Sequence, residues 1–419
     1  MSQLQSPARI SATSADASLE AVRLRELICQ AARTACVNSF GNALTGIVLT
    51  GSVARDEGSF VRQGDSWSLY GDVEFIVVFG KRASMPSAAT LSAICRQIED
   101  HLKEHRHIHC RVDLSAVGPG YLRGLPPHIF SYELKQCGNV IWGDSRILQS
   151  IPNFSASDLS REDAWRLLCN RLIELLAFFE SPSLVSREPT LSLQYATLKL
   201  YLDTATSYLV FAGAYEPTYR HRAEKLRSLA EQQHALDGDF QFSLADLSAR
   251  VSESTERKLS GDFARPGRPA QSLTDAIRFA QAVWKWEAAR LTGASADKST
   301  DALFDCLSAQ LKFTARIRGW ASVAKRDGGL KSWPSWPRWA RLTFRTSPRY
   351  AVYRAGVHLA FRLPELLGDC KGEAISNGEL SALCSQLPAG ETYAPRADWH
   401  STANAVLRNY KEFVVTTVA

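Results

Sequence analysis

Two apolar segments that meet polar residues at one end constrain the fold of this chain more than any other feature. GIVLT stops at Gly51-Ser52, and DVEFIVVF opens with Asp72 and Glu74. Strand residues two positions apart share a face, so both carboxylates point to one side of a strand and the alternate apolar residues to the other. The residues expected on the core face are Val73, Phe75, Val77 and Phe79. The pattern predicts strands with one buried and one polar face.

A third predicted strand, HIHCRVDLSAV, repeats this arrangement and places Asp113 on its polar face. Neighbouring carboxylates repel each other unless a positive charge lies between them, and a divalent cation is the usual solution. Three carboxylates on adjacent strands are the minimum for holding two Mg²⁺ ions across a nucleoside triphosphate. Gly51 would let the backbone approach a phosphate closely, and the Ser52 hydroxyl and the following N–H groups would bind its oxygens.

These segments carry a family resemblance. LTGSVAR, GDVEFIVVF and RVDLSAV together resemble the DNA polymerase β-like nucleotidyltransferase superfamily, and SYELKQCGNVIWGD is similar to the segment that closes such domains. The resemblance covers residues 45–145, about a quarter of the chain, and is strongest to the bacterial minimal and aminoglycoside-adenylyltransferase-like domains. The spacer before Asp72 is longer than usual, which predicts an inserted loop at residues 59–70. Glu74 stands where many members have Asp.

The resemblance implies an Mg²⁺-dependent nucleotidyltransferase, with two ions for which Mn²⁺ can substitute. Such an enzyme transfers a nucleoside monophosphate, here AMP from ATP, to a hydroxyl group and releases pyrophosphate. Asp72 and Glu74 would bind both metal ions, whereas Asp113 would bind the catalytic ion and help to deprotonate the acceptor. Gly51 and Ser52 would hold the β- and γ-phosphates. The acceptor stays open, with a small molecule or a protein favoured over RNA.

A second resemblance lies in the following helical region, where family members have a triphosphate-contacting lysine and a Tyr-x-x-Arg segment. The matching positions are Lys199, Tyr219 and Arg222, and the first two are predicted nucleotide-binding residues. The alternative is that Lys199 lies on a solvated helix face, and that Tyr219 and Arg222 are structural.

Composition and pattern together predict an α+β fold, with a small mixed β-sheet domain followed by a mostly α-helical region. The expected parts are a disordered tail at 1–17, the nucleotidyltransferase domain at 18–150, a helical domain at 151–295 and a basic, aromatic-rich helical region at 301–419. The sequence contains no run of 18 apolar residues, so it predicts no transmembrane helix. The 9 scattered cysteines form no Cys-x-x-Cys pair, which indicates a reducing cytoplasm.

The segment at residues 312–354 concentrates the basic character of the chain, with eleven Lys and Arg residues against one acid, Asp327. Trp320, Trp333, Trp336 and Trp339 interleave with these cations. Such interleaving suits contact with an anionic acceptor, with nucleic acid or with a membrane surface. The alternative is a helical region whose aromatic residues form a core and whose cations are solvated.

Two other functions remain open beside catalysis by a transferase. The first is a non-catalytic scaffold that senses a nucleotide and docks on a polyanion or a membrane. The second is a synthase of an oligonucleotide second messenger, which uses nucleotides as both donor and acceptor. The complete set of Asp72, Glu74 and Asp113 argues against the scaffold, because a binding module has no need of all three.

Overall fold

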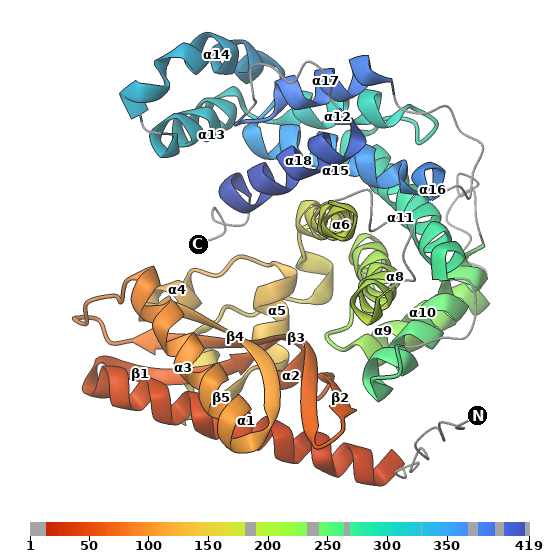
Figure 1. The fold of residues 1–419 in the computed structure, drawn as a ribbon. Coiled ribbons are helices and arrows are strands. Elements are labelled where there is room, and N and C mark those ends of the chain that lie inside the picture. The colour runs from red at the N-terminus through yellow and green to blue at the C-terminus, as the bar shows by residue number, and fades with distance from the viewer. Residues whose placement is uncertain are drawn as a thin grey trace, which may run out of the picture. The chain divides into compact units, whose positions relative to one another are not determined.

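The computed structural model describes residues 14–180, 190–232, 243–263, 269–327, 329–367, 376–389 and 398–414. The chain divides into two compact units, Met1–Phe154 with Leu259–Gly261, and Ser155–Lys258 with Asp262–Ala419. The first contains a β-sheet with helices and the second is helical, which confirms the α+β fold class (Figure 1). The predicted tail at 1–17 lies largely outside the described residues, although helix α1 begins at Ser14.

The first unit is built on a mixed sheet of five strands. These are β1 (Leu44–Thr50), β2 (Ser59–Gln63), β3 (Ser66–Phe79), β4 (Ile108–Val117) and β5 (Asn139–Gly143). Strand β3 is central, because it pairs parallel to β4 on one edge and antiparallel to β2 and then β1 on the other. Strand β5 extends the sheet by pairing antiparallel to β1.

The long spacer before Asp72 is a β-hairpin rather than the predicted inserted loop. Strand β2 pairs with the beginning of β3, with Ser59 opposite Tyr70 and Gln63 opposite Ser66. Gly64 has φ +63° and forms, with Asp65, a two-residue turn of the kind that hairpins favour. The spacer therefore extends the sheet.

Helices α1 (Ser14–Phe40) and α3 (Ala88–Arg106) cover one face of the sheet. Their apolar residues pack against Val73, Phe75, Val77 and Phe79, which are buried as predicted. The opposite face is apolar only in part, where Ile76 and Val78 pack against α4 (Pro119–Arg123) and α5 (Ile129–Cys137). Asp72 and Glu74 precede this apolar part on the same strand.

The second unit packs its helices around an aromatic core. Trp165 of α6 contacts the rings of Trp284, Phe304, Tyr350 and Tyr353. Its helices include α6 (Arg161–Leu175), α8 (Leu191–Phe211), α9 (Tyr219–Glu231), α10 (Leu244–Ser260), α11 (Pro269–Thr292), α12 (Thr300–Gln310), α13 (Phe313–Arg326), α14 (Trp336–Arg345), α15 (Pro348–Phe361), α17 (Asn377–Gln386) and α18 (Trp399–Phe413). The predicted boundary near residue 295 falls on the connection between α11 and α12, which both belong to this unit. Among the described helices, none is both long and apolar enough to cross a membrane.

Candidate active site

The register of the sheet aligns the predicted carboxylates. Thr50 of β1 lies opposite Glu74 of β3, and Glu74 lies opposite Asp113 of β4. Residues directly opposite each other on paired strands share a face, and adjacent strands are roughly 4.8 Å apart. Asp72 lies on the same face, two positions before Glu74 and opposite Arg111. All three predicted acids therefore lie on one face of neighbouring strands.

The Gly51 turn packs directly against this row. Strand β1 ends at Thr50, and Gly51, with φ +71°, begins the short helix α2 (Gly51–Ala54). A Cβ atom at Gly51 would lie 2.8 Å from Oε2 of Glu74, closer than real Cβ contacts come. The positive φ favours glycine here, and a Cβ atom would force the end of the Glu74 side chain to move. The structure thus brings together Gly51, a predicted phosphate-binding residue, and Glu74, a predicted metal ligand.

The outer carboxylates of the row are accessible to solvent. Asp113 is exposed, and the Asp72 side chain is 39% exposed. Arg111, whose side chain is 77% exposed, places Nε 3.3 Å from Oδ1 of Asp72. An exposed ion pair of this kind contributes at most about 1 kcal/mol. Arg111 is therefore a weakly held cation beside the carboxylates.

The carboxylates match the hard oxygen ligands that Mg²⁺ prefers, and they share a face. However, within the described ranges no three His, Cys, Asp or Glu side chains come close enough together to hold a metal ion. The residue types and their common face fit the predicted ion, whereas the side chains are not gathered around a single point.

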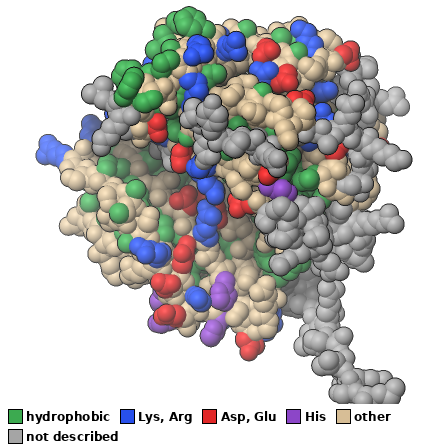
Figure 2. Space-filling model, turned by 45° about the horizontal axis from the view of Figure 1, so that its top comes forward, with side chains coloured by type: hydrophobic (Ala, Val, Ile, Leu, Met, Phe, Trp, Pro, Cys, Tyr) green, Lys and Arg blue, Asp and Glu red, His purple; other side chains and the backbone are tan. Residues whose placement is uncertain are grey.

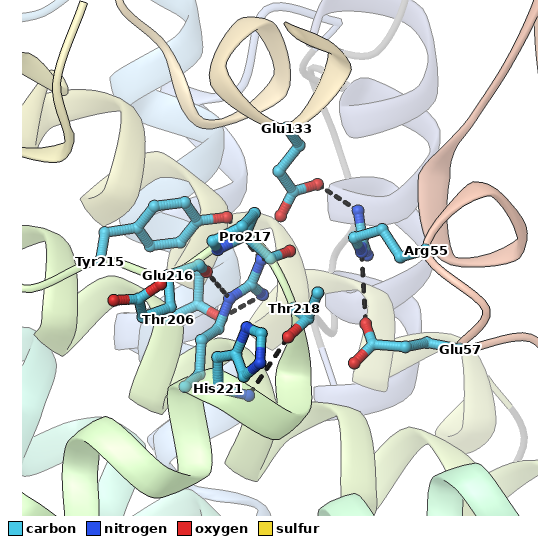
Figure 3. A network of polar contacts seen from close by, with 10 residues as sticks. Arg55, Glu57, Glu133, Thr206, Tyr215, Glu216, Pro217, Thr218 and His221 are labelled. Atoms are coloured by element: carbon cyan, nitrogen blue, oxygen red, sulfur yellow. Dashed lines mark hydrogen bonds and ion pairs between the residues drawn. The ribbon is translucent and has the colours of Figure 1, made fainter. Parts of the chain in front are cut away.

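A buried ion network, which no motif of the sequence predicted, supports the residues that follow the Gly51 turn. Arg55 Nε lies 3.3 Å from Oε2 of Glu57, and Arg55 Nη1 contacts Glu133 of α5 (Figure 3). The exposed fractions of these side chains are 5% for Arg55, 5% for Glu57 and 16% for Glu133. Arg55 and Glu133 both lie in the motifs that carry the family resemblance, GSVAR and SYELK. The network ties α2 to α5.

Lys199 and Tyr219 lie in the helical unit, on α8 and α9. Lys199 is half-buried, one helical turn before Asp203. Burial acts to raise the pKa of Asp203, but Arg171 and then Lys199 outweigh it and hold this pKa below its ordinary value. Tyr219 is 6% exposed, and its role in nucleotide binding stays a prediction.

The buried side chain of Arg222 makes the contacts of a structural residue. Its guanidinium donates hydrogen bonds to the carbonyls of Glu216 at 2.7 Å and Pro217 at 2.9 Å, and to Oγ1 of Thr206 at 2.9 Å. The Arg222 guanidinium also contacts the hydroxyl of Tyr215, which Figure 3 labels together with the other partners. Further ring contacts join Arg222 and Lys258 to Tyr219, at 4.9 and 5.1 Å from its centroid. Arg222 ties the α8–α9 connection to α8.

Comparison with known proteins adds no family to these observations, because neither the protein-family models nor the curated proteins contain a match to this chain. The resemblance to nucleotidyltransferases therefore rests on the motifs.

Proposed function

We propose that the protein is an Mg²⁺-dependent nucleotidyltransferase that moves AMP from ATP to a hydroxyl group. The observation that carries this proposal is the packing of Gly51 against the Glu74 carboxylate, in the row that continues to Asp113. Nucleotidyl transfer needs a phosphate-binding turn beside acids that hold the metal ions, because the reaction is catalysed mainly by positioning and charge stabilisation.

In the proposed reaction, the acceptor oxygen forms a bond to the α-phosphorus of ATP. The bond from this phosphorus to the bridging oxygen breaks, and pyrophosphate leaves. Asp113 would accept the proton of the acceptor hydroxyl at a carboxylate oxygen, while Gly51 and Ser52 would bind the leaving phosphates through backbone N–H groups and the serine hydroxyl. Asp72 and Glu74, with Asp113, would hold the Mg²⁺ ions, which neutralise phosphate charge when bound.

The proposed acceptor is a small molecule or a protein, because the sequence contains no recognisable RNA-binding module. The proposed compartment is the cytoplasm. The cysteines of the described ranges are all free, which agrees with a reducing environment.

The test is release of pyrophosphate and transfer of label from α-³²P-labelled ATP, CTP, GTP and UTP, with Mg²⁺ or Mn²⁺. We expect transfer from ATP, and we expect Asp113→Asn to reduce its rate about 100-fold or more, as loss of a proton acceptor does. The matched control is Asp100→Asn, which removes one exposed negative charge from α3 and should leave the rate unchanged.

Two results would identify a different function. A protein that binds ATP but releases no pyrophosphate, and in which Asp72→Ala binds ATP and Mg²⁺ as tightly as the wild type, would be a nucleotide-sensing scaffold. Label that appears in cyclic or linear oligonucleotides would identify a second-messenger synthase.

A further inference from the structure

Helices α13 and α14 form a hairpin, and two tryptophan side chains pack between the helices. The rings of Trp320 and Trp339 stack at 6.5 Å, and both side chains are buried in a cluster with Val323 and Leu342. Trp320 donates a hydrogen bond to the carbonyl of Thr346 at 2.9 Å, and Trp339 donates one to the carbonyl of Pro388 at 3.0 Å. Two of the four tryptophans of the basic segment therefore build the core of this hairpin.

The same hairpin also carries apolar side chains that are exposed to solvent. On α14, Trp336 and Phe344 lie near the two ends of the helix and are 43% and 71% exposed. On α13, Phe313 and Ile317 are each 46% exposed and one turn apart. The rings of Phe313 and Phe344 are 5.4 Å apart, which joins the two helices. Trp333, in the connection before α14, is 68% exposed. We call these residues the outer patch.

Exposed cations occur along both helices and at the residue before α13. The side chains of five of them make no hydrogen bond or ion pair with other described residues: Lys312, Arg318, Lys325, Arg341 and Arg345. By contrast, Arg316 and Arg338 donate to the backbone carbonyls of Ser308 and Pro388 and so serve the fold. Figure 2 shows hydrophobic side chains at the upper left of the molecule, with Lys and Arg side chains nearby.

We propose that the outer patch docks on the surface of an anionic lipid bilayer. Aromatic and aliphatic side chains of an interfacial helix enter the boundary between headgroups and acyl chains, while flanking Lys and Arg side chains reach the lipid phosphates. The charge is complementary, since the segment at 312–354 has eleven cations and one acid. The outer patch would bind from one side, as a peripheral contact.

The composition of the outer patch favours a membrane over RNA. Single-stranded nucleic acid binds to aromatic side chains whose flat faces are open to successive bases. Here the rings of Phe313 and Phe344 contact each other, and the aliphatic Ile317 continues the surface. Such a surface buries well in acyl chains. This inference goes beyond the proposed nucleotidyl transfer and does not rest on it.

The experiment is co-sedimentation of the full-length protein with vesicles of phosphatidylcholine alone or with one third phosphatidylglycerol. We expect binding to the anionic vesicles, weak binding to the neutral ones and a decline with added salt. The double variant Arg341→Gln/Arg345→Gln should lower the affinity about 25-fold, because each surface cation contributes about fivefold. The double variant Trp336→Ser/Phe344→Ser should lower it further.

The matched control is Leu191→Ser with Lys103→Gln, which changes an exposed apolar residue and an exposed cation elsewhere. It should bind vesicles like the wild type, and circular dichroism should show the same helix content for every variant. The proposal is wrong if the wild type does not sediment with anionic vesicles, or if both patch variants bind like the control. Tight binding of a 20-nucleotide single-stranded RNA that the patch variants abolish, without vesicle binding, would assign the outer patch to nucleic acid.

Discussion

The candidate site of the sheet unit and the core of the helical unit hold their ion pairs in opposite surroundings. In the sheet unit, the ion pair at the candidate site is exposed, with the side chain of Asp72 39% exposed beside Arg111. In the helical unit, the Asp203 side chain that pairs with Arg171 is only 5% exposed. Buried ions lose hydration and persist only when they are paired, so they indicate architecture. The exposed ion pair of Asp72 and Arg111 contributes little to the fold, so the alignment of the acids is compatible with the proposed ligand-binding role.

The largest expected effect is on the free energy of unfolding, when the cation is removed from the buried pair of Arg171 and not from the exposed pair of Arg111. Arg171 lies with Nε 2.6 Å from Oδ2 of Asp203 and with Nη1 2.5 Å from Oε2 of Glu174. Arg171→Ala would leave the Asp203 carboxylate buried without this partner, so we expect the free energy of unfolding to fall by about 3–5 kcal/mol. Arg111→Ala should change it by less than about 1 kcal/mol. Urea denaturation followed by circular dichroism measures both. Equal effects would contradict the distinction between the exposed pair at Asp72 and the buried pair at Asp203.

The next prediction concerns a buried acid of the helical unit. Glu287 of α11 has no exposed surface, and burial raises its pKa well above 4.5, an effect that the Ser207 hydroxyl opposes. The folded state therefore keeps the proton at a pH at which the unfolded state has lost it. The stabilisation is complete below the pKa of the unfolded state and is lost as the pH rises towards that of the folded state.

In the wild type, the Glu287 carboxyl should make the free energy of unfolding fall as the pH rises, by up to about 1.4 kcal/mol for each pH unit above 5. Glu287→Gln keeps a neutral side chain of the same size, so its stability should depend less on pH and should exceed that of the wild type at pH 8. Glu256→Gln, which alters an exposed acid of α10, is the control. If Glu287→Gln and Glu256→Gln show the same pH dependence, Glu287 ionises normally in the folded state.

The sequence predicted those parts of the sheet unit that depend on local pattern. The two-residue period of a strand is local, so the faces of β3 and β4 could be predicted, and with them the common side of Asp72 and Glu74. The end of β1 at Gly51 could be predicted for the same reason. The prediction of a loop at residues 59–70 was wrong. It came from the usual distance between the Gly-Ser turn and the first acid in the family. The hairpin was indicated by Gly64-Asp65, which lies between residues that favour strands.

Other features depend on contacts between distant residues, which no local pattern specifies. Arg55 and Glu133 are 78 positions apart, so their ion pair emerged only from the fold. The tryptophans of the basic segment show the same limit, since Trp336 is 43% exposed and Trp339 is 4% exposed although they are three residues apart. The side of α14 that packs on α13 decides which of the two is buried.

The smallest expected effect is the difference in stability between alanine variants at Gly51 and at Gly64, and this comparison tests the candidate site most directly. Gly51 and Gly64 have φ +71° and +63°, so alanine at either position should cost about 1–2 kcal/mol of backbone strain. The added Cβ would meet Oε2 of Glu74 at Gly51 but has no atom within 4 Å at Gly64. The Glu74 side chain can swing away, so the two variants should differ in stability by less than about 0.5 kcal/mol.

The variants Gly51→Ala and Gly64→Ala should differ instead in function. In Gly51→Ala, the movement of the Glu74 side chain takes its carboxylate out of the row with Asp113. We expect Gly51→Ala to weaken binding of ATP with Mg²⁺ about tenfold and to slow transfer, as small misplacements of a site do, whereas Gly64→Ala should behave like the wild type. Isothermal titration calorimetry measures the binding apart from the reaction. If Gly51→Ala binds ATP and Mg²⁺ like Gly64→Ala, the turn and the carboxylate row do not form one site, and the alignment of acids in the sheet unit loses its functional meaning.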